Sequence, residues 1–307
     1  MRLIRGLQNL ARQARPSAVT IGNFDGVHRG HQALLARQAA LCGAGEQRVV
    51  LVFEPTPREH FAPESAPPRI QTFRDKLACL QVAGVYAVLC LRFGAALAAM
   101  SAERFVREVL VDGLRASSVV VGDDFRFGAG RQGDLELLQA QGAEQGFVAD
   151  GLASVREDGR RISSTAIREA LAIPDLVAAE AMLGRPLRIG GRVRKGLQLG
   201  RELGMPTANL MLRRRPALRY GVYAVRVAVD GGRRRDGVAN LGVRPTLDLQ
   251  RMLLEAHVFD CNEDFYGRQM SVEFVHFLRP EKRFDDIGAL STQMQADAAR
   301  ARELLSA

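Results

Sequence analysis

Short, continuous apolar runs alternate with helical stretches through the first 180 or so of the 307 residues. Runs with the composition of buried strands cover residues 18–21, 48–53, 86–91 and 118–121. Helical patterns cover residues 31–41, 73–82 and 102–111. Continuous apolar strands separated by helices predict a parallel sheet that is covered on both faces. Ligands of such sheets bind beyond the carboxyl ends of the strands.

The composition changes after Leu183, where Gly184-Arg185-Pro186 has the character of a linker. Short strand-like runs divided by Gly, Pro and Asp follow at 187–193, 223–229, 238–241, 253–259 and 271–277. This spacing predicts an antiparallel sandwich or small barrel, and a helical pattern follows over 287–305. We therefore expect two domains, 1–183 and 184–307.

The net charge of +9 needs care, because only three of the 43 cationic residues are lysines. Arginine spread along the whole chain is not the clustered patch of a nucleic-acid surface, and anionic substrates such as phosphates explain a positive field equally well. We expect no nucleic-acid partner. The charged N-terminus lacks a signal-peptide core, and no run approaches the ~18 apolar residues of a membrane span. The cysteines lack C-x-x-C spacing, so we expect a cytoplasmic protein without a membrane partner.

The segment Gly22-Asn23-Phe24-Asp25-Gly26-Val27-His28-Arg29-Gly30-His31 follows a predicted strand and begins a predicted helix. Glycines let the backbone approach a ligand closely, and a helix N-terminus offers N–H groups to a phosphate. His28 and His31 are spaced so that both imidazoles can face one phosphate and stabilise charge during transfer. A pair of metal ligands is a weaker alternative, because no third ligand has matching spacing. A purely structural turn is the other alternative.

Five glycines between Gly190 and Gly204 precede Pro206-Thr207-Ala208-Asn209. Such glycine density lets the backbone wrap a phosphate, although the P-loop pattern is absent. Thr207 and Asn209 supply neutral oxygens of the kind that suit Mg²⁺. A polar turn after proline is the alternative for this stretch taken alone.

The G-x-F-D-G-V-H-x-G-H segment resembles the H-x-G-H signature of the nucleotidyltransferases, in the form found in prokaryotic bifunctional riboflavin kinase/FAD synthetases. Ile162-Ser163-Ser164-Thr165-Ala166-Ile167-Arg168 is similar to the second ATP motif of that family. The string from Gly191 to Asn209 resembles the riboflavin kinase signature, with Met205 where the family usually has Phe. Blocks at 239–246, 255–257, 264–267 and 277–284 extend the resemblance to nearly the whole chain.

The resemblance implies an α/β nucleotidyltransferase (Rossmann-like) domain that transfers AMP to FMN, followed by an antiparallel β-barrel riboflavin kinase domain with a terminal helix. It implies ATP and Mg²⁺ as co-substrate and cofactor, riboflavin, FMN and FAD as flavins, and ADP and pyrophosphate as products. The residues expected to bind nucleotide are Gly22, Asn23, Phe24, Asp25, Gly30, Ser163, Ser164, Gly196, Gly200, Pro206, Thr207 and Asn209.

Ser164 and Arg168 are four residues apart, so one helical face can present both to a phosphate chain. We expect His28, His31 and Arg168 to be catalytic in AMP transfer. The Gly122–Gly128 loop is similar to the flavin loop of the family, which implies flavin contacts for Asp124, Phe125 and Arg126. A polar turn with two core aromatic residues is the alternative.

Glu255 is the expected base of the kinase, because a primary alcohol is a poor nucleophile at neutral pH. A structural partner of an arginine is the alternative, and both faces of its strand are too apolar to decide which way Glu255 points. Arg279 resembles a flavin-site residue. Two rival functions are a chain with one inactive half and a flavin- or nucleotide-binding regulator that contacts nucleic acid. The sequence leaves the oligomeric state undecided.

Overall fold

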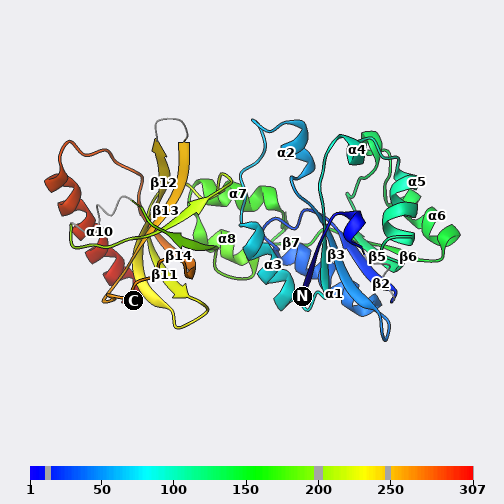
Figure 1. The fold of residues 1–307 in the computed structure, drawn as a ribbon, viewed down its shortest axis with the longest axis horizontal. Helices are drawn as coiled ribbons and strands as arrows, with labels where there is room; N and C mark the ends of the chain where they lie inside the picture. The colour runs from blue at the N-terminus through cyan, green and yellow to red at the C-terminus, as the bar shows by residue number, and fades with distance from the viewer. Residues whose placement is uncertain (11–14, 197–202, 246–249, 307) are drawn as a thin grey trace. The chain divides into compact units, whose positions relative to one another are not determined.

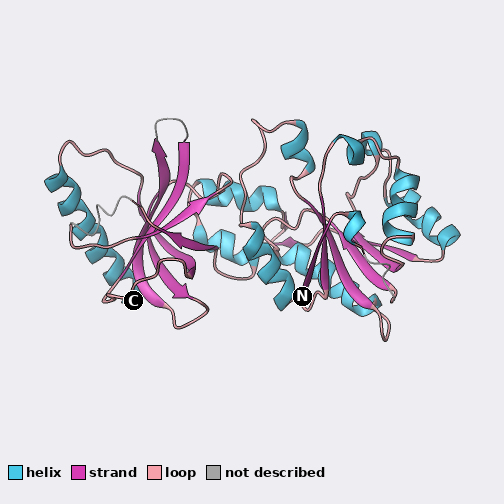
Figure 2. Ribbon diagram, viewed as in Figure 1, coloured by secondary structure: helices cyan, strands magenta, loops and turns pink. Residues whose placement is uncertain are grey.

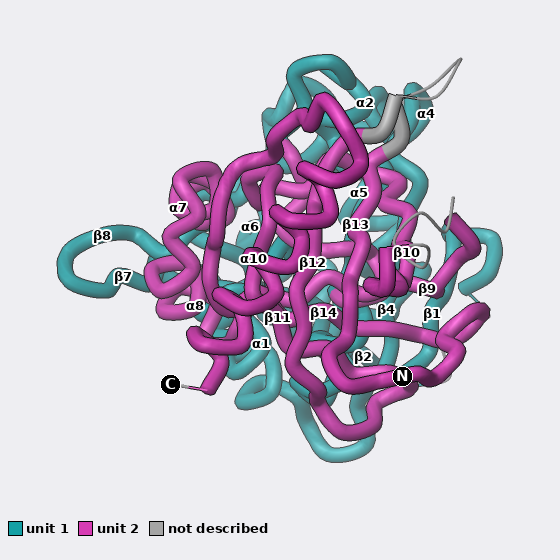
Figure 3. Tube along the Cα trace, turned by 90° about the vertical axis from the view of Figure 1, so that its left-hand side faces the viewer, with its two compact units in different colours: residues 1–67, 76–163 teal, residues 68–75, 164–307 magenta. Residues whose placement is uncertain are grey.

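The computed structural model describes residues 1–10, 15–196, 203–245 and 250–306 (Figure 1). The chain forms two compact units, which Figure 3 distinguishes by colour. The first unit contains residues 1–67 and 76–163, and the second contains residues 68–75 and 164–307.

The first unit is built on a six-stranded sheet in the order β1-β4-β3-β2-β5-β6. All five pairs of neighbouring strands in this sheet are parallel. The strands are β1 (Arg2–Arg5), β2 (Ser17–Ile21), β3 (Gln47–Phe53), β4 (Ala87–Leu91), β5 (Ala116–Gly122) and β6 (Val148–Leu152). The prediction of a parallel sheet is confirmed, and β1 and β6 at its two edges are additional strands.

The sheet is buried on both faces because helices cover it. Strand residues that alternate in direction, such as Val19 and Ala18, are both fully buried. The helical elements of this unit are α1 (Arg29–Leu41), α2 (Pro57–Phe61), most of α3 (Phe73–Val82), α4 (Ala95–Ala98), α5 (Ala102–Phe105), π-helical η2 (Val106–Val111) and α6 (Leu135–Gln145), with 3₁₀ turns η1 (Leu7–Asn9) and η3 (Ala129–Arg131). A hairpin of β7 (Arg156–Glu157) and β8 (Arg160–Arg161) follows β6. The predicted helix over 102–111 is thus an α-helical turn continued by a π-helix.

The second unit contains a closed antiparallel barrel in the order β10-β13-β12-β11-β14-β9, drawn in magenta in Figure 2. Its strands are β9 (Arg188–Arg194), β10 (Ala208–Leu212), β11 (Gly221–Val229), β12 (Arg235–Pro245), β13 (Gln250–Val258) and β14 (Gln269–Arg279). The barrel confirms the predicted antiparallel architecture. Strand β10 is additional, since the Pro206–Asn209 stretch had the composition of a turn.

The described residues of this unit also form the helices α7 (Ser164–Ala172), α8 (Leu176–Leu183) and α10 (Ile287–Ser306). Helix α10 contacts strands β11, β12 and β14, and its buried residues Ala301 and Leu305 share an apolar cluster with Val222 and Val238. The predicted terminal helix is therefore confirmed. The predicted domain boundary at 183/184 stays a prediction. The two compact units of the structure change over at 67/68, 75/76 and 163/164.

Candidate functional sites

The loop from Gly22 to His28 lies at a topological switch point of the parallel sheet. Strand β2 pairs with β3 on one side and with β5 on the other, so the chain reverses its direction of travel across the sheet there. The loop after β2 and the Gly122–Gly128 loop after β5 therefore begin at the carboxyl ends of two neighbouring strands. This is the position where open parallel sheets bind their ligands.

The backbone of the first loop is strained at residues whose side chains are buried. Phe24 and Val27 have φ angles of 49° and 40°, and Gly26 has a φ of 91°. A left-handed conformation costs a non-glycine residue about 1–2 kcal/mol. The side chains of Phe24 and Val27 are 0% and 2% exposed, so packing holds both residues in place. Such strain persists where surroundings fix it, and it is typical of ligand-binding turns.

His28 and His31 lie against each other at the start of α1. His28 caps the helix, because its Nδ1 accepts a hydrogen bond of 3.3 Å from the backbone N–H of His31. The two imidazole rings are stacked with centroids 3.7 Å apart. A Cβ atom at Gly30 would lie 3.1 Å from the His28 ring, so glycine gives this ring its room. The structure therefore brings the two predicted histidines together beside the N–H groups that begin a helix.

Some side chains of the Gly122–Gly128 loop are exposed to solvent, and others pack against the core. Asp124 and Arg126 are exposed, and Asp124 accepts a 2.6 Å bond from Arg161 on the β7–β8 hairpin. The rings of Phe125 and Phe127 stack at 5.3 Å, and Phe127 belongs to the buried core. Arg126 and Asp124 can therefore reach a ligand, whereas Phe125 also packs against the core.

The β7–β8 hairpin is a feature that sequence reasoning missed. Glu157 forms an ion pair with Arg29 at the start of α1, and Arg161 forms one with Asp124. The hairpin thus connects the α1 end of the Gly22–His31 loop to the loop after β5. Its sequence signal was Asp158-Gly159, a dipeptide that favours two-residue hairpin turns, and both residues have a positive φ angle in the structure.

The second ATP motif begins helix α7. Ser163 closes the first unit, and Ser164 is the first residue of α7 in the second unit. Arg168 lies one turn further along the helix, half-buried, and its Nε donates a 2.8 Å hydrogen bond to the carbonyl of Pro68. The predicted helical spacing of Ser164 and Arg168 is confirmed, and the backbone of residue 68 fixes the guanidinium.

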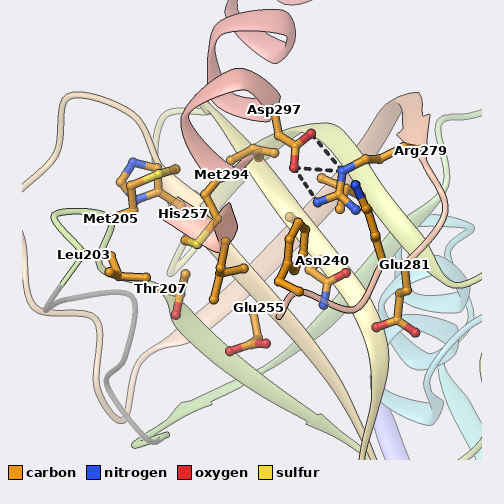
Figure 4. Close-up of a pocket in the computed structure, with 16 residues that line it drawn as sticks. Leu203, Met205, Thr207, Asn240, Glu255, His257, Arg279, Glu281, Met294 and Asp297 are labelled. Carbon is orange, nitrogen blue, oxygen red and sulfur yellow. Dashed lines mark hydrogen bonds and ion pairs between the residues drawn. The ribbon is translucent and has the colours of Figure 1, made fainter. Parts of the chain in front are cut away.

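Three polar residues lie side by side in the barrel wall. Asn209 of β10 is in register with Glu255 of β13, and Glu255 is in register with Asn240 of β12. Directly opposed residues of antiparallel strands project from the same face. Glu255 therefore projects with two amides, and Figure 4 shows it between Thr207 and Asn240 at a cavity.

Two cavities of the barrel share one lining residue, Thr207. The first, of about 210 Å³, has Glu255 and Asn240 in its wall together with apolar residues such as Met205, Met294 and Phe284. The second, of about 360 Å³, is bounded by Pro206, Ala208, Cys261–Tyr266 and neighbouring apolar residues. Thr207 lines both cavities.

The turn before β10 is fitted closely around Asn209. The Asn209 amide is 5% exposed and donates a 3.4 Å bond to the carbonyl of Thr207. A Cβ atom at Gly196 would lie 2.6 Å from the amide nitrogen, so only glycine leaves room there. The carbonyl of the exposed Pro206 lies 2.9 Å from Nδ1 of His257. The predicted residue Gly200 lies outside the described residues.

Arg279 lies at the far wall of the first cavity, where α10 contacts the barrel. Its guanidinium donates three hydrogen bonds of 2.7–3.1 Å to the carboxylate of Asp297. Glu281 lies over Gly242, where any Cβ atom would clash with its carboxylate. Burial raises the pKa of Glu281, and the negative charge of Glu255 raises it further. The cavity thus holds a fixed cation at one wall and two neighbouring carboxylates at another.

An aromatic cluster after strands β3 and β4 was also missed. His60, Phe61 and Phe93 lie in mutual edge contact with centroids 5.2–5.6 Å apart, and Phe53 joins them through Phe93. Phe61 is 69% exposed. These residues follow the carboxyl ends of two sheet strands, so they offer a planar ligand an apolar surface. Their separation in the sequence hid the cluster.

Within the described ranges, no three His, Cys, Asp or Glu side chains gather into a metal centre. Thr207 and Asn209 nevertheless fit Mg²⁺, because this ion accepts neutral oxygens and completes its shell with water and substrate phosphates. Among the helices that the structure describes, none is long and apolar enough to cross a membrane.

Known proteins match both halves of the chain. A family model described as FAD synthetase matches residues 10–166, and one described as riboflavin kinase matches residues 183–305. The chain is 48% identical over 306 residues to the bifunctional riboflavin kinase/FMN adenylyltransferase of Pseudomonas fluorescens, covering 99% of this chain and 98% of that protein. The protein of the same name from Escherichia coli strain K12 is 47% identical over 308 residues, with coverages of 99% and 97%.

A solved structure from Streptococcus pneumoniae, described as a macrolide-efflux protein, has a TM-score of 0.79 and 28% identity. It covers 98% of this chain and 99% of that chain, so the fold is shared throughout. The matches confirm the predicted resemblance and the order of the two enzymatic halves. The chain therefore belongs to the bifunctional riboflavin kinase/FMN adenylyltransferase family.

Proposed function

We propose that the barrel phosphorylates riboflavin at a site that contains Thr207, Asn209 and Glu255. We propose further that the α/β unit adenylylates the resulting FMN at the Gly22–His31 loop. The overall conversion uses ATP twice and yields FAD, with ADP and pyrophosphate as by-products. The observation that carries the kinase assignment is the placement of Thr207, which lines both cavities, near Glu255, which lines the first cavity and is in register with Asn209.

The position of Glu255 assigns the two cavities. A base must lie within reach of the hydroxyl that it deprotonates, so riboflavin occupies the cavity that Glu255 lines. ATP then occupies the neighbouring cavity bounded by Pro206 and Tyr266. The apolar wall of the first cavity suits the isoalloxazine ring, and Arg279, held by Asp297, borders the flavin.

Phosphoryl transfer follows from this placement. The riboflavin 5′-oxygen forms a bond to the γ-phosphorus of ATP, the bond from that phosphorus to the β,γ-bridging oxygen breaks, and Glu255 accepts the hydroxyl proton. Thr207 and Asn209 would hold Mg²⁺, which when bound neutralises charge on the transferred phosphate. Gly196 keeps the Asn209 amide in place.

Adenylyl transfer needs orientation more than a base. The FMN phosphate is already anionic when it attacks the α-phosphorus of ATP, and pyrophosphate leaves. His28, His31 and the first N–H groups of α1 donate hydrogen bonds to the phosphates of ATP. Ser163, Ser164 and Arg168 keep the nucleotide roles that their motif predicts. Asp124, Phe125 and Arg126 keep the predicted flavin role.

The remaining assignments rest on the sequence. The lack of paired cysteine spacing supports a cytoplasmic enzyme. The evenly spread arginines support phosphate-bearing substrates rather than a nucleic-acid partner.

A chromatographic time course tests the proposal. Purified protein is incubated with riboflavin, ATP and Mg²⁺, and FMN and FAD are followed separately. FMN should appear first and FAD should follow as FMN accumulates. Formation of neither product would overturn both assignments, and FMN without FAD would overturn the assignment of the α/β unit.

A further inference from the structure

Lys76 is a buried residue that contacts the backbone of the Gly22–His31 loop. It belongs to the first unit, where its side chain is 0% exposed. Its Nζ donates a 2.7 Å hydrogen bond to the backbone carbonyl of Asn23. This carbonyl directly precedes Phe24, the first strained residue of the loop.

Two rules argue against a lysine at this position. A buried ammonium loses its hydration, and lysine is almost never fully buried unless it is partnered. Lys76 also lies in the first turn of α3, where the helix dipole disfavours a positive charge. A buried lysine therefore depends on its partners, and one partner of Lys76 is a backbone carbonyl of the Gly22–His31 loop.

Lys76 shares its surroundings with other titratable groups. Burial raises the pKa of the Cys90 thiol, the negative charge of Glu54 raises it further, and the positive charge of Lys76 opposes the rise. The charges of Lys76 and Glu54 thus both act on one buried thiol near the end of β4.

The loop is held at two carbonyl groups. Lys76 holds that of Asn23, and the Nε2 of Gln32 donates a 2.9 Å bond to that of Val27. The left-handed residues Phe24, Gly26 and Val27 lie between these two anchors. Gln32 is itself part of α1, whereas Lys76 holds the loop from another helix, α3.

We propose that Lys76 is a positioning residue of FMN adenylylation. Its bond to Asn23 fixes the start of the Gly22–His31 loop. The loop then holds His28 and His31, at its other end, in the geometry in which they bind the phosphates of ATP. Lys76 does not touch the substrate, because it is fully buried. Loss of its bond lets the strained turn relax, and small misplacements of catalytic groups reduce rates strongly. This inference rests on the proposed adenylyltransferase role of the loop.

The test uses the full chain, in which the riboflavin kinase reaction reports independently on folding. Lys76→Met removes the donor and keeps a similar length, and Lys76→Arg keeps the charge with a different head group. Arg74→Met is the matched control, because it removes an exposed cation from the same helix. The kcat and the KM for ATP and for FMN are measured with FMN supplied directly.

Lys76→Met should lower kcat/KM for ATP in FMN adenylylation on the order of 10- to 100-fold. The KM for FMN and the kinase rate should change by no more than about twofold, as should every constant of Arg74→Met. Lys76→Arg should recover part of the loss.

Adenylylation by Lys76→Met within about twofold of the unaltered chain would overturn the proposal. Parallel loss of both activities would also overturn it, because it would show a general structural role. If Lys76→Met does not fold, Lys76→Arg decides: adenylylation must fall while phosphorylation persists. Failure of the unaltered chain to make FAD would instead refute the function of the loop.

Discussion

Replacing Glu255 with glutamine removes the proposed proton acceptor of the kinase site while keeping a side chain of nearly the same shape. The glutamine amide still lies between Asn209 and Asn240, which flank this position in the barrel wall. The substitution therefore changes the chemistry of the site much more than its packing.

The magnitude follows from the role of the carboxylate. A positioned general base contributes about 10²–10⁴-fold to a rate, which corresponds to about 2.7–5.4 kcal/mol of barrier. We expect kcat for riboflavin phosphorylation to fall by this factor. The KM for riboflavin should stay within about threefold, because glutamine preserves the cavity wall.

The assay measures both half-reactions on one preparation, with FMN from riboflavin and FAD from supplied FMN resolved chromatographically. Glu273→Gln is the matched control, because Glu273 is a barrel carboxylate that pairs with Arg188 outside both described cavities. Its kinase kcat should stay within about twofold, even if its thermal midpoint falls. A loss below about threefold in Glu255→Gln, or equal loss of FAD formation, would refute the reasoning.

Gly196→Ala places a methyl group 2.6 Å from the Asn209 amide. It should lower kinase kcat/KM on the order of tenfold, and unchanged steady-state kinetics would contradict the fitted turn. Asp297→Asn weakens the charged bonds to Arg279 and should lower the free energy of unfolding by about 1–3 kcal/mol in urea titrations, with no loss if the pair is dispensable. Burial raises the pKa of Glu281 above 4.5, so its contribution to stability is complete below that value and is lost as the pH rises through the raised pKa. Glu281→Gln should lessen this loss in denaturation curves measured as the pH rises above about 4.5, and an identical pH dependence would contradict it.

The sequence predicted elements whose signals are local. Central strands such as β3 are continuously apolar, and the observed Gln47–Phe53 differs from the expected 48–53 by one residue. Edge strands were harder to predict, because β1 (Arg2–Arg5) has an arginine at each end and three of its four residues are exposed. Strand β10 was hidden because its first residues belong to the P-T-A-N motif, whose composition favours a turn.

The residues of the two candidate sites could be predicted from the sequence, but their arrangement in space was harder to predict. The facing of Glu255 depends on the register of β10, β12 and β13, which no local pattern specifies. Lys76 has the sequence signature of an ordinary surface lysine, and only the fold shows its bond to Asn23. The Arg168–Pro68 bond likewise joins residues that are 100 positions apart.

The central claim is that one chain carries two separable sites, and mixing two variants tests it most directly. Glu255→Gln and His31→Gln proteins are each supplied with riboflavin, ATP and Mg²⁺, alone and together, and FAD is measured. Each variant alone should form FAD slowly, and the mixture should form it much faster, because FMN made by one variant is adenylylated by the other. A mixture no faster than the sum of its parts, with each variant retaining its other half-reaction, would contradict the account.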